Sequence, residues 1–252
     1  MPTSSTETRL ALLRAAERLF AERGVDAVSM REIAATAGQA NHSAVLYHFN
    51  DKRALLNAVL ERHSGPLEQS WRLALNGPGA RSHWELEELV DLMVRSVVAL
   101  LDDKDGGTEY LLVVAELVTS RSFPVTEMPA ASAPGIQALT TAMMSRMAPF
   151  AVHLMPLRMM RAAAVLYCSI SDYHRLTRAG LAIQREDFVA DLVASLVGLL
   201  GRAPEASAAP SRSPRPDRGP DQHDRRFRGE GNQGACGAPF RADLARVVVI
   251  PR

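Results

Sequence analysis

The sequence predicts an all-α protein, with an N-terminal three-helix domain followed by a larger helical domain. Aromatic residues make up only 5% of the chain, whereas hydrophobic residues reach 47%, and this balance favours helices over sheets. Apolar side chains recur at the three- and four-residue steps of a buried helix face. Stretches rich in glycine and proline separate these periodic segments.

The composition limits the class of protein. A chain of 252 residues with 23% charged residues is typical of a soluble globular protein. No apolar run approaches the ~18 residues of a membrane-spanning helix, and the N-terminus MPTSSTETRL lacks the apolar core of a secretory signal. The two cysteines, Cys168 and Cys236, are far apart and imply no disulfide framework. We therefore expect a cytoplasmic protein.

The first helix is expected to begin near the N-terminus and to end at Gly24. Its buried face is formed by Leu10, Leu13, Ala16 and Phe20. Ser4 and Glu7 have the spacing of a capping box, which pairs two unbonded amides at a helix start. Gly24 suits the left-handed conformation that closes many helices.

Three shorter elements are expected to follow. Ser29 and Glu32 form a second capping box, and Gly38 ends the helix that it opens. Asn50 or Asp51 can cap the fourth helix. The buried faces of these helices are predicted to contain Ile33, Ala34 and Ala37, then Val45, Leu46 and Phe49, then Leu55, Leu56, Val59 and Leu60.

After Gly65-Pro66 the apolar faces become wider and the helices longer. We predict helices near residues 66–75, 82–101, 107–122, 133–147, 157–178 and 186–200. The pattern therefore predicts an N-terminal domain of short helices over residues 6–64 and a larger helical domain over residues 65–201. Residues 202–252 are dominated by Pro, Ser, Arg, Gly and Asp, which predicts a disordered tail.

The stretch over residues 29–52, SMREIAATAGQANHSAVLYHFNDK, is the most informative part of the chain. A short amphipathic segment, a glycine and a polar-faced second segment precede an aromatic and basic cluster. This order suits a helix that lies in a DNA groove with its flanks on phosphate. Residues 1–63 hold 8 Lys and Arg against 7 Asp and Glu, a net +1, so binding would depend on a few well-placed cations.

Individual residues of this stretch have the chemistry of DNA contacts. Ser29 opens a helix whose N-terminal amides can face a phosphate. Asn41 can make a bidentate contact with adenine, and the small Ala40 and Ala44 permit close approach to a base edge. The predicted base-reading residues are Gln39, Ala40, Asn41, His42, Ser43 and Ala44.

The segments ERLFAERG, VSMREIAATAG and YHFNDKRALLNAVL resemble the TetR family of bacterial transcriptional regulators, as far as Arg62. The resemblance implies an N-terminal DNA-binding helix-turn-helix and a variable helical domain that dimerises and often binds a small effector. It also implies that Tyr47, His48 and Lys52 contact phosphate. GQANHSAVLY is longer than the family's usual turn.

These observations together predict a dimeric repressor that binds a palindromic DNA operator and is released by a small hydrophobic effector. The segments MMRAAAVLYCSISDYHRL and FVADLVASLVGLL combine small residues with Leu and Val, which suits close helix packing between two copies. No enzymatic activity and no cofactor or metal site are expected, because the histidines have no metal-ligand spacing and no phosphate-binding glycine motif is present.

Other interpretations of the sequence stay open. Cys168, Asp172 and His174 suggest a nucleophilic triad, but the histidine would lie on another side of the same helix. The alternative function is a helical ligand-binding sensor or enzyme that does not bind DNA, which the net charge of only +1 favours. A third is a scaffold whose tail recruits partners. Tyr47 could be a core aromatic, and Lys52 could belong to a solvated surface.

Overall fold

The computed structural model describes residues 5–39, 43–120, 133–147 and 154–201. Its helices are α1 (Ser5–Arg23), α2 (Met30–Thr36), α3 (Ser43–Phe49), α4 (Lys52–Asn76), α5 (Leu86–Val98), the 3-10 helix η1 (Ala99–Asp102), α6 (Gly107–Leu117), α7 (Pro134–Met144), α8 (Met155–Arg178) and α9 (Arg185–Gly201). No strand occurs among these residues, so the predicted all-α fold class is confirmed.

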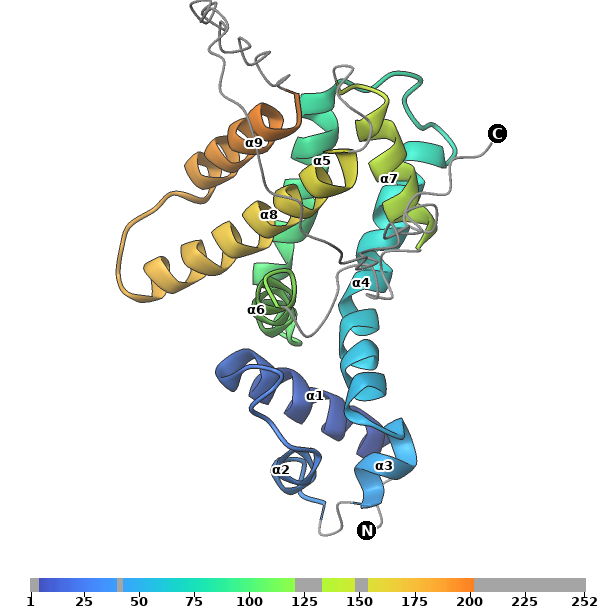
Figure 1. The fold of residues 1–252 in the computed structure, drawn as a ribbon, viewed down its shortest axis with the longest axis vertical. Helices are drawn as coiled ribbons and strands as arrows, with labels where there is room; N and C mark the ends of the chain where they lie inside the picture. The colour runs from blue at the N-terminus through green and yellow to red at the C-terminus, as the bar shows by residue number, and fades with distance from the viewer. Residues whose placement is uncertain (1–4, 40–42, 121–132, 148–153, 202–252) are drawn as a thin grey trace, which may run out of the picture. The chain divides into compact units, whose positions relative to one another are not determined.

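The N-terminal helices α1, α2 and α3 pack together around the first half of α4 (Figure 1). Their shared core is built largely from the apolar faces that the sequence pattern identifies. Its fully buried members include Leu12, Ala16, Phe20, Ile33, Val45, Leu55 and Leu56. The prediction that Leu10 is buried is wrong, since 37% of this residue is exposed and Leu12 takes the buried position on α1. Gly24 has φ +84°, the left-handed conformation expected of it, and so α1 ends where predicted. We call this part of the molecule, residues 5–60, the head.

The remaining helices form the body around the second half of α4. Helix α7 packs on α4, α5 on α9, and α6 on α8, while α8 and α9 lie side by side (Figure 1). The buried residues of the body include Leu89, Val94, Leu111, Val114, Ile170 and Leu196. Helix α5 begins later than predicted because Glu85 and Glu88 form a capping box that starts it at Leu86.

Helix α4 runs without interruption through Gly65 and Pro66, so the helix break predicted there is wrong. Pro66 lacks the amide hydrogen that would bond to the carbonyl of Arg62, which normally weakens a helix interior. The helix nevertheless continues, because Leu67 and Trp71 extend the same buried stripe along α4. Tertiary packing therefore outweighs the local preference at this point.

The predicted boundary between residues 64 and 65 stays a prediction, and it falls inside α4. The tail predicted over residues 202–252 lies outside the described residues.

Candidate nucleic-acid interface and its junction with the body

Ser29 begins α2 as predicted. It takes the N-cap position with extended backbone angles, φ −95° and ψ 152°, and its Oγ accepts a hydrogen bond from the Glu32 amide at 3.2 Å. A serine hydroxyl that accepts a bond can still donate its own hydrogen. The exposed Ser29 therefore combines a helix cap with a donor of the kind that contacts phosphate.

Helix α2 ends at the glycine that the sequence indicates. Gly38 has φ +71°, and the Gln39 amide donates to the Ala34 carbonyl at 2.9 Å, which closes the last turn. Gln39 is half-buried. The predicted base-reading residues Ala40, Asn41 and His42 lie outside the described residues, and Ser43 and Ala44 open α3.

Helix α3 turns Val45 and Phe49 into the core, and the Arg9 guanidinium lies 4.9 Å from the centre of the Phe49 ring. Tyr47, in contrast, is 81% exposed, so the core-aromatic interpretation does not hold for it. The prediction that Leu46 is buried is wrong, since 43% of this residue is exposed. Because α3 spans only Ser43–Phe49, Val45 and Phe49 suffice to anchor it.

His48 and Lys52 complete the residues predicted to contact phosphate. The His48 ring packs edge-on against Tyr47, with ring centres 5.2 Å apart. Asp51 caps α4 by accepting from the Ala54 amide at 2.7 Å, so Lys52 stands in the first turn of that helix. The Lys52 Nζ donates to the Asp26 carbonyl at 3.3 Å, which holds it against the turn after α1.

A group of charged residues that the sequence analysis missed joins the head to the body. We call it the junction cluster, and it consists of Arg14, Glu17, Arg62, His63, Asp103 and Asp105. Glu17 accepts from Arg62 Nη1 at 2.6 Å, and its other oxygen lies 2.7 Å from His63 Nε2. His63 Nδ1 lies 3.3 Å from an Asp103 oxygen. Both Glu17 and His63 are buried.

The sequence does contain a signal for this cluster. Glu17 lies four residues after Leu13 and three before Phe20, within the buried face of α1. His63 lies between Leu60 and Leu67 in the same way on α4. A charged residue at a buried helical position requires a partner, so these two positions together predict a buried polar contact.

A second polar contact joins the head to the body. It lies at the C-terminal end of α6, whereas the junction cluster lies beside the N-terminal end of that helix. The Glu116 carboxylate accepts from the Val25 amide at 3.0 and 3.1 Å, directly after the positive-φ Gly24. Burial raises the pKa of Glu116, although the hydrogen bond from Val25 opposes the shift. The carbonyl of the neighbouring Asp26 accepts the hydrogen bond from Lys52 Nζ. A carboxylate of the body therefore holds the turn that positions a predicted phosphate contact.

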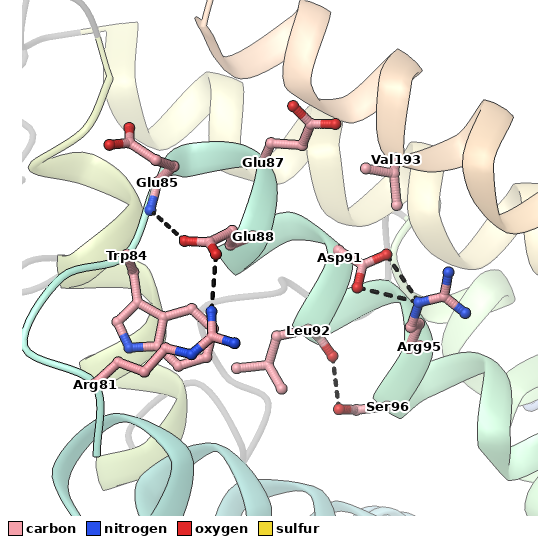
Figure 2. Close-up of a pocket in the computed structure, with 10 residues that line it drawn as sticks. All are labelled: Arg81, Trp84, Glu85, Glu87, Glu88, Asp91, Leu92, Arg95, Ser96 and Val193. Carbon is pink, nitrogen blue, oxygen red and sulfur yellow. Dashed lines mark hydrogen bonds and ion pairs between the residues drawn. The ribbon is translucent and has the colours of Figure 1, made fainter. Parts of the chain in front are cut away.

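Beside α5 the body has a cleft of about 630 Å³ (Figure 2). Its walls are largely charged, and they include Arg81, Trp84, Glu85, Glu87, Glu88, Asp91, Arg95 and, from α9, Val193. Arg81 lies over the Trp84 ring at 5.0 Å and pairs with Glu88 at 2.8 Å, while Arg95 pairs with Asp91 at 2.9 Å. Two of the four carboxylates lining the cleft, Glu88 and Asp91, are thus paired with its two arginines.

The residues weighed as a nucleophilic triad do not come together. Asp172 pairs with Arg175 at 2.9 Å, and the Cys168 thiol faces the Ala115 carbonyl at 3.9 Å. Burial raises the pKa of Cys168 and lowers that of His174, which disfavours a thiolate. Within residues 5–39, 43–120, 133–147 and 154–201, no three metal-ligating side chains gather and no helix could span a bilayer.

Comparison with known proteins supports the resemblance found in the sequence. Residues 12–59 match the model of a family described as bacterial regulatory proteins, tetR family. An HTH-type transcriptional repressor of Mycobacterium tuberculosis is 49% identical over 61 residues, which is 24% of this chain and 32% of the relative. The HTH-type transcriptional repressor BepR of Brucella suis is 40% identical over 65 residues, 26% of this chain and 31% of the relative.

The chain thus matches about a third of the length of these curated relatives. Among solved structures, Salmonella enterica GusR aligns with 79% of this chain and 98% of its own, at 22% identity and a TM-score of 0.48.

Proposed function

Because the N-terminal domain of this chain belongs to the TetR family of bacterial transcriptional regulators, we propose that the protein is a repressor that binds a palindromic DNA operator as a dimer. The observation that supports this most is the exposure of Tyr47 on α3, together with Ser29 at the start of α2 and Lys52 at the start of α4. These three side chains have the chemistry of phosphate contacts that fix a helix in the major groove.

The proposed contacts are those expected from the sequence. Ser29, Tyr47, His48 and Lys52 bind phosphate, and the residues over 39–44 read base edges. Since phosphate contacts carry no sequence information, the first group sets affinity and the second sets operator choice.

The proposed dimer forms through α8 and α9. Leu157, Met160 and Val165 are exposed on α8, and α9 exposes the small residues Ala190, Ala194 and Gly198. An apolar stripe beside small residues suits a two-fold interface in which helices approach closely. The two heads would then meet half-sites about 34–36 Å apart. Sedimentation at micromolar concentration tests this, and a strictly monomeric species would contradict it.

Release by a small hydrophobic effector is the regulatory part of the proposal. An effector that displaces α6 would act on the head through the junction cluster at one end of α6 and through Glu116 at the other. Release requires that the ligand bind the two states of the dimer with different affinity. A thermal-shift screen of apolar ligands tests for it, and the absence of any stabilising ligand would count against this part.

Selection of bound DNA from a random pool tests the DNA-binding proposal directly. We expect a palindrome to be enriched. Lys52→Ala should weaken binding to every sequence and lower the slope of affinity against salt by about one, whereas Asn41→Ala should change the preferred bases. Arg72→Ala is the control, because Arg72 is an exposed cation on α4 outside both the proposed DNA contacts and the proposed dimer interface. Wild-type protein that enriches no sequence at low salt would overturn the proposal.

A further inference from the structure

We propose that Leu46, an aliphatic side chain exposed on α3 beside Tyr47, recognises the methyl group of a thymine in the operator. This inference rests on the proposed DNA-binding function and adds one specificity-determining residue to it. It concerns a residue that the sequence pattern assigns to the core and that the structure turns outward.

The orientation of Leu46 follows from its neighbours. Val45 and Phe49 are both buried, and they define the inward face of α3. At ~100° per residue, Leu46 lies to one side of that face and Tyr47 lies opposite it. Among the described residues of the head, the exposed large hydrophobic side chains are Leu10, Leu46 and Tyr47. Two of these three stand next to each other on α3.

Local structure prevents Leu46 from turning inward. Asn50 has φ +57° and ends α3, and Asp51 immediately caps α4. Rotation of α3 to bury Leu46 would expose Val45, which fits a fully enclosed position. The head therefore keeps an aliphatic group on the surface of the helix that we propose reads DNA.

The chemistry of the major groove indicates which base group Leu46 contacts. Most base-edge groups there are hydrogen-bond donors or acceptors, and the thymine C5-methyl group is the apolar exception. Leucine neither donates nor accepts a hydrogen bond. Contact with a methyl group removes apolar surface of both partners from water, whereas cytosine at the same position offers no such group. Leu46 thus favours thymine over cytosine.

Uracil substitution in the operator tests this contact, since uracil keeps the base-pairing atoms of thymine and lacks only the methyl group. The operator is first obtained by selection with wild-type protein, and each thymine is then replaced in turn. At one thymine per half-site, uracil should weaken wild-type binding about fourfold, the value of one buried methyl group. The same replacement should leave the affinity of Leu46→Ala unchanged.

Leu10→Ala is the matched control, because Leu10 is exposed to a similar extent, 37%, but lies on α1. This variant should keep the wild-type response to uracil. Thermal melting should show that both variants fold, as expected for exposed positions.

The outcomes separate this inference from the proposed function. If wild-type protein enriches no operator, DNA recognition itself fails. If an operator is enriched but uracil changes nothing at any position, or changes wild type and Leu46→Ala equally, the role of Leu46 is overturned and the proposed function stands.

Discussion

The junction cluster and the cleft beside α5 contain the same types of residue in very different surroundings. Arg62 meets Glu17 at 2.6 Å, and Arg81 meets Glu88 at 2.8 Å. The side chains of the first pair are 15% and 3% exposed, whereas those of the second are 63% and 43% exposed. Nearly equal distances therefore accompany very different burial. Distance alone does not show which ion pair holds the fold together.

Burial changes how much each ion pair contributes to the stability of the fold. An exposed pair exchanges contacts with water and is screened by salt, so its removal has little effect. Removal of one partner from a buried pair leaves a charge without compensation inside the protein. Glu17 has two such partners, Arg62 and His63. We therefore expect substitutions at the junction to be far more damaging than substitutions around the cleft.

The largest effect is expected for Glu17→Gln, which keeps the size of the side chain and removes its charge. The free energy of unfolding should fall by about 3 kcal/mol, at the lower end of the range for broken buried pairs, because Arg62 retains Asp105. Denaturant titration measures this value. Glu88→Gln is the control, and its unfolding midpoint should match wild type within error. Equal effects of the two variants would contradict the comparison.

A smaller effect is expected for Gly106→Ala. Gly106 has φ +102°, and an added Cβ would overlap with the Glu17 carboxylate. The variant should lose about 1–2 kcal/mol from the left-handed backbone. Displacement of the carboxylate adds to this loss, but the total should stay below the ~3 kcal/mol of Glu17→Gln because the charge of Glu17 is retained. Gly79→Ala separates the two causes, because Gly79 has φ +83° with no atom within 4 Å of a Cβ. If both variants lost the same free energy of unfolding, the overlap of the new Cβ with Glu17 would make no contribution to the loss.

The smallest effect concerns Asp105 and appears as a pH dependence. The hydrogen bond from Arg62 lowers the pKa of Asp105, against an opposing effect of burial and with help from Arg14. The stability that Asp105 contributes is complete above the ordinary aspartate pKa of about 3.9 and is lost as the pH falls through the lower folded value. Because 56% of this side chain is exposed, the gain over Asp105→Asn should be only about 0.5–1 kcal/mol.

Melting curves of wild type and Asp105→Asn between neutral and strongly acid pH would show this dependence. The two proteins should differ at neutral pH and converge in acid. A difference that stays constant down to the lowest pH would show that the charge of Asp105 is not its cause.

The sequence predicted most helix ends correctly, because those ends depend on local chemistry. Ser29, Gly24 and Gly38 each do what their residue types favour within a few residues of chain. The predicted break at Gly65-Pro66 failed since the contact of α4 with α7 is not local. The prediction that Leu46 is buried failed for a related reason. A period of three and four residues identifies a buried face, but it does not show how wide that face is on a short helix.

The candidate site, too, could be predicted from the sequence only where it depends on local chemistry. The exposure of Ser29 and Tyr47 agrees with the roles expected of them, although their contacts with DNA stay predictions. The junction cluster went unrecognised because its members are up to 91 residues apart, as Arg14 and Asp105 are. Buried polar side chains on two separate helices indicate that partners exist, but only the fold shows that Glu17 and His63 share one site.

The passage of Pro66 through the interior of α4 has a mechanical consequence. A helix bends with least cost where a backbone hydrogen bond is missing, and here the bond missing is the one to the carbonyl of Arg62. The side chain of that same residue is fastened to Glu17 and Asp105. The ionic contacts thus stabilise α4 at the point where it bends most easily, and in the proposed dimer their loss would let the two heads change their separation.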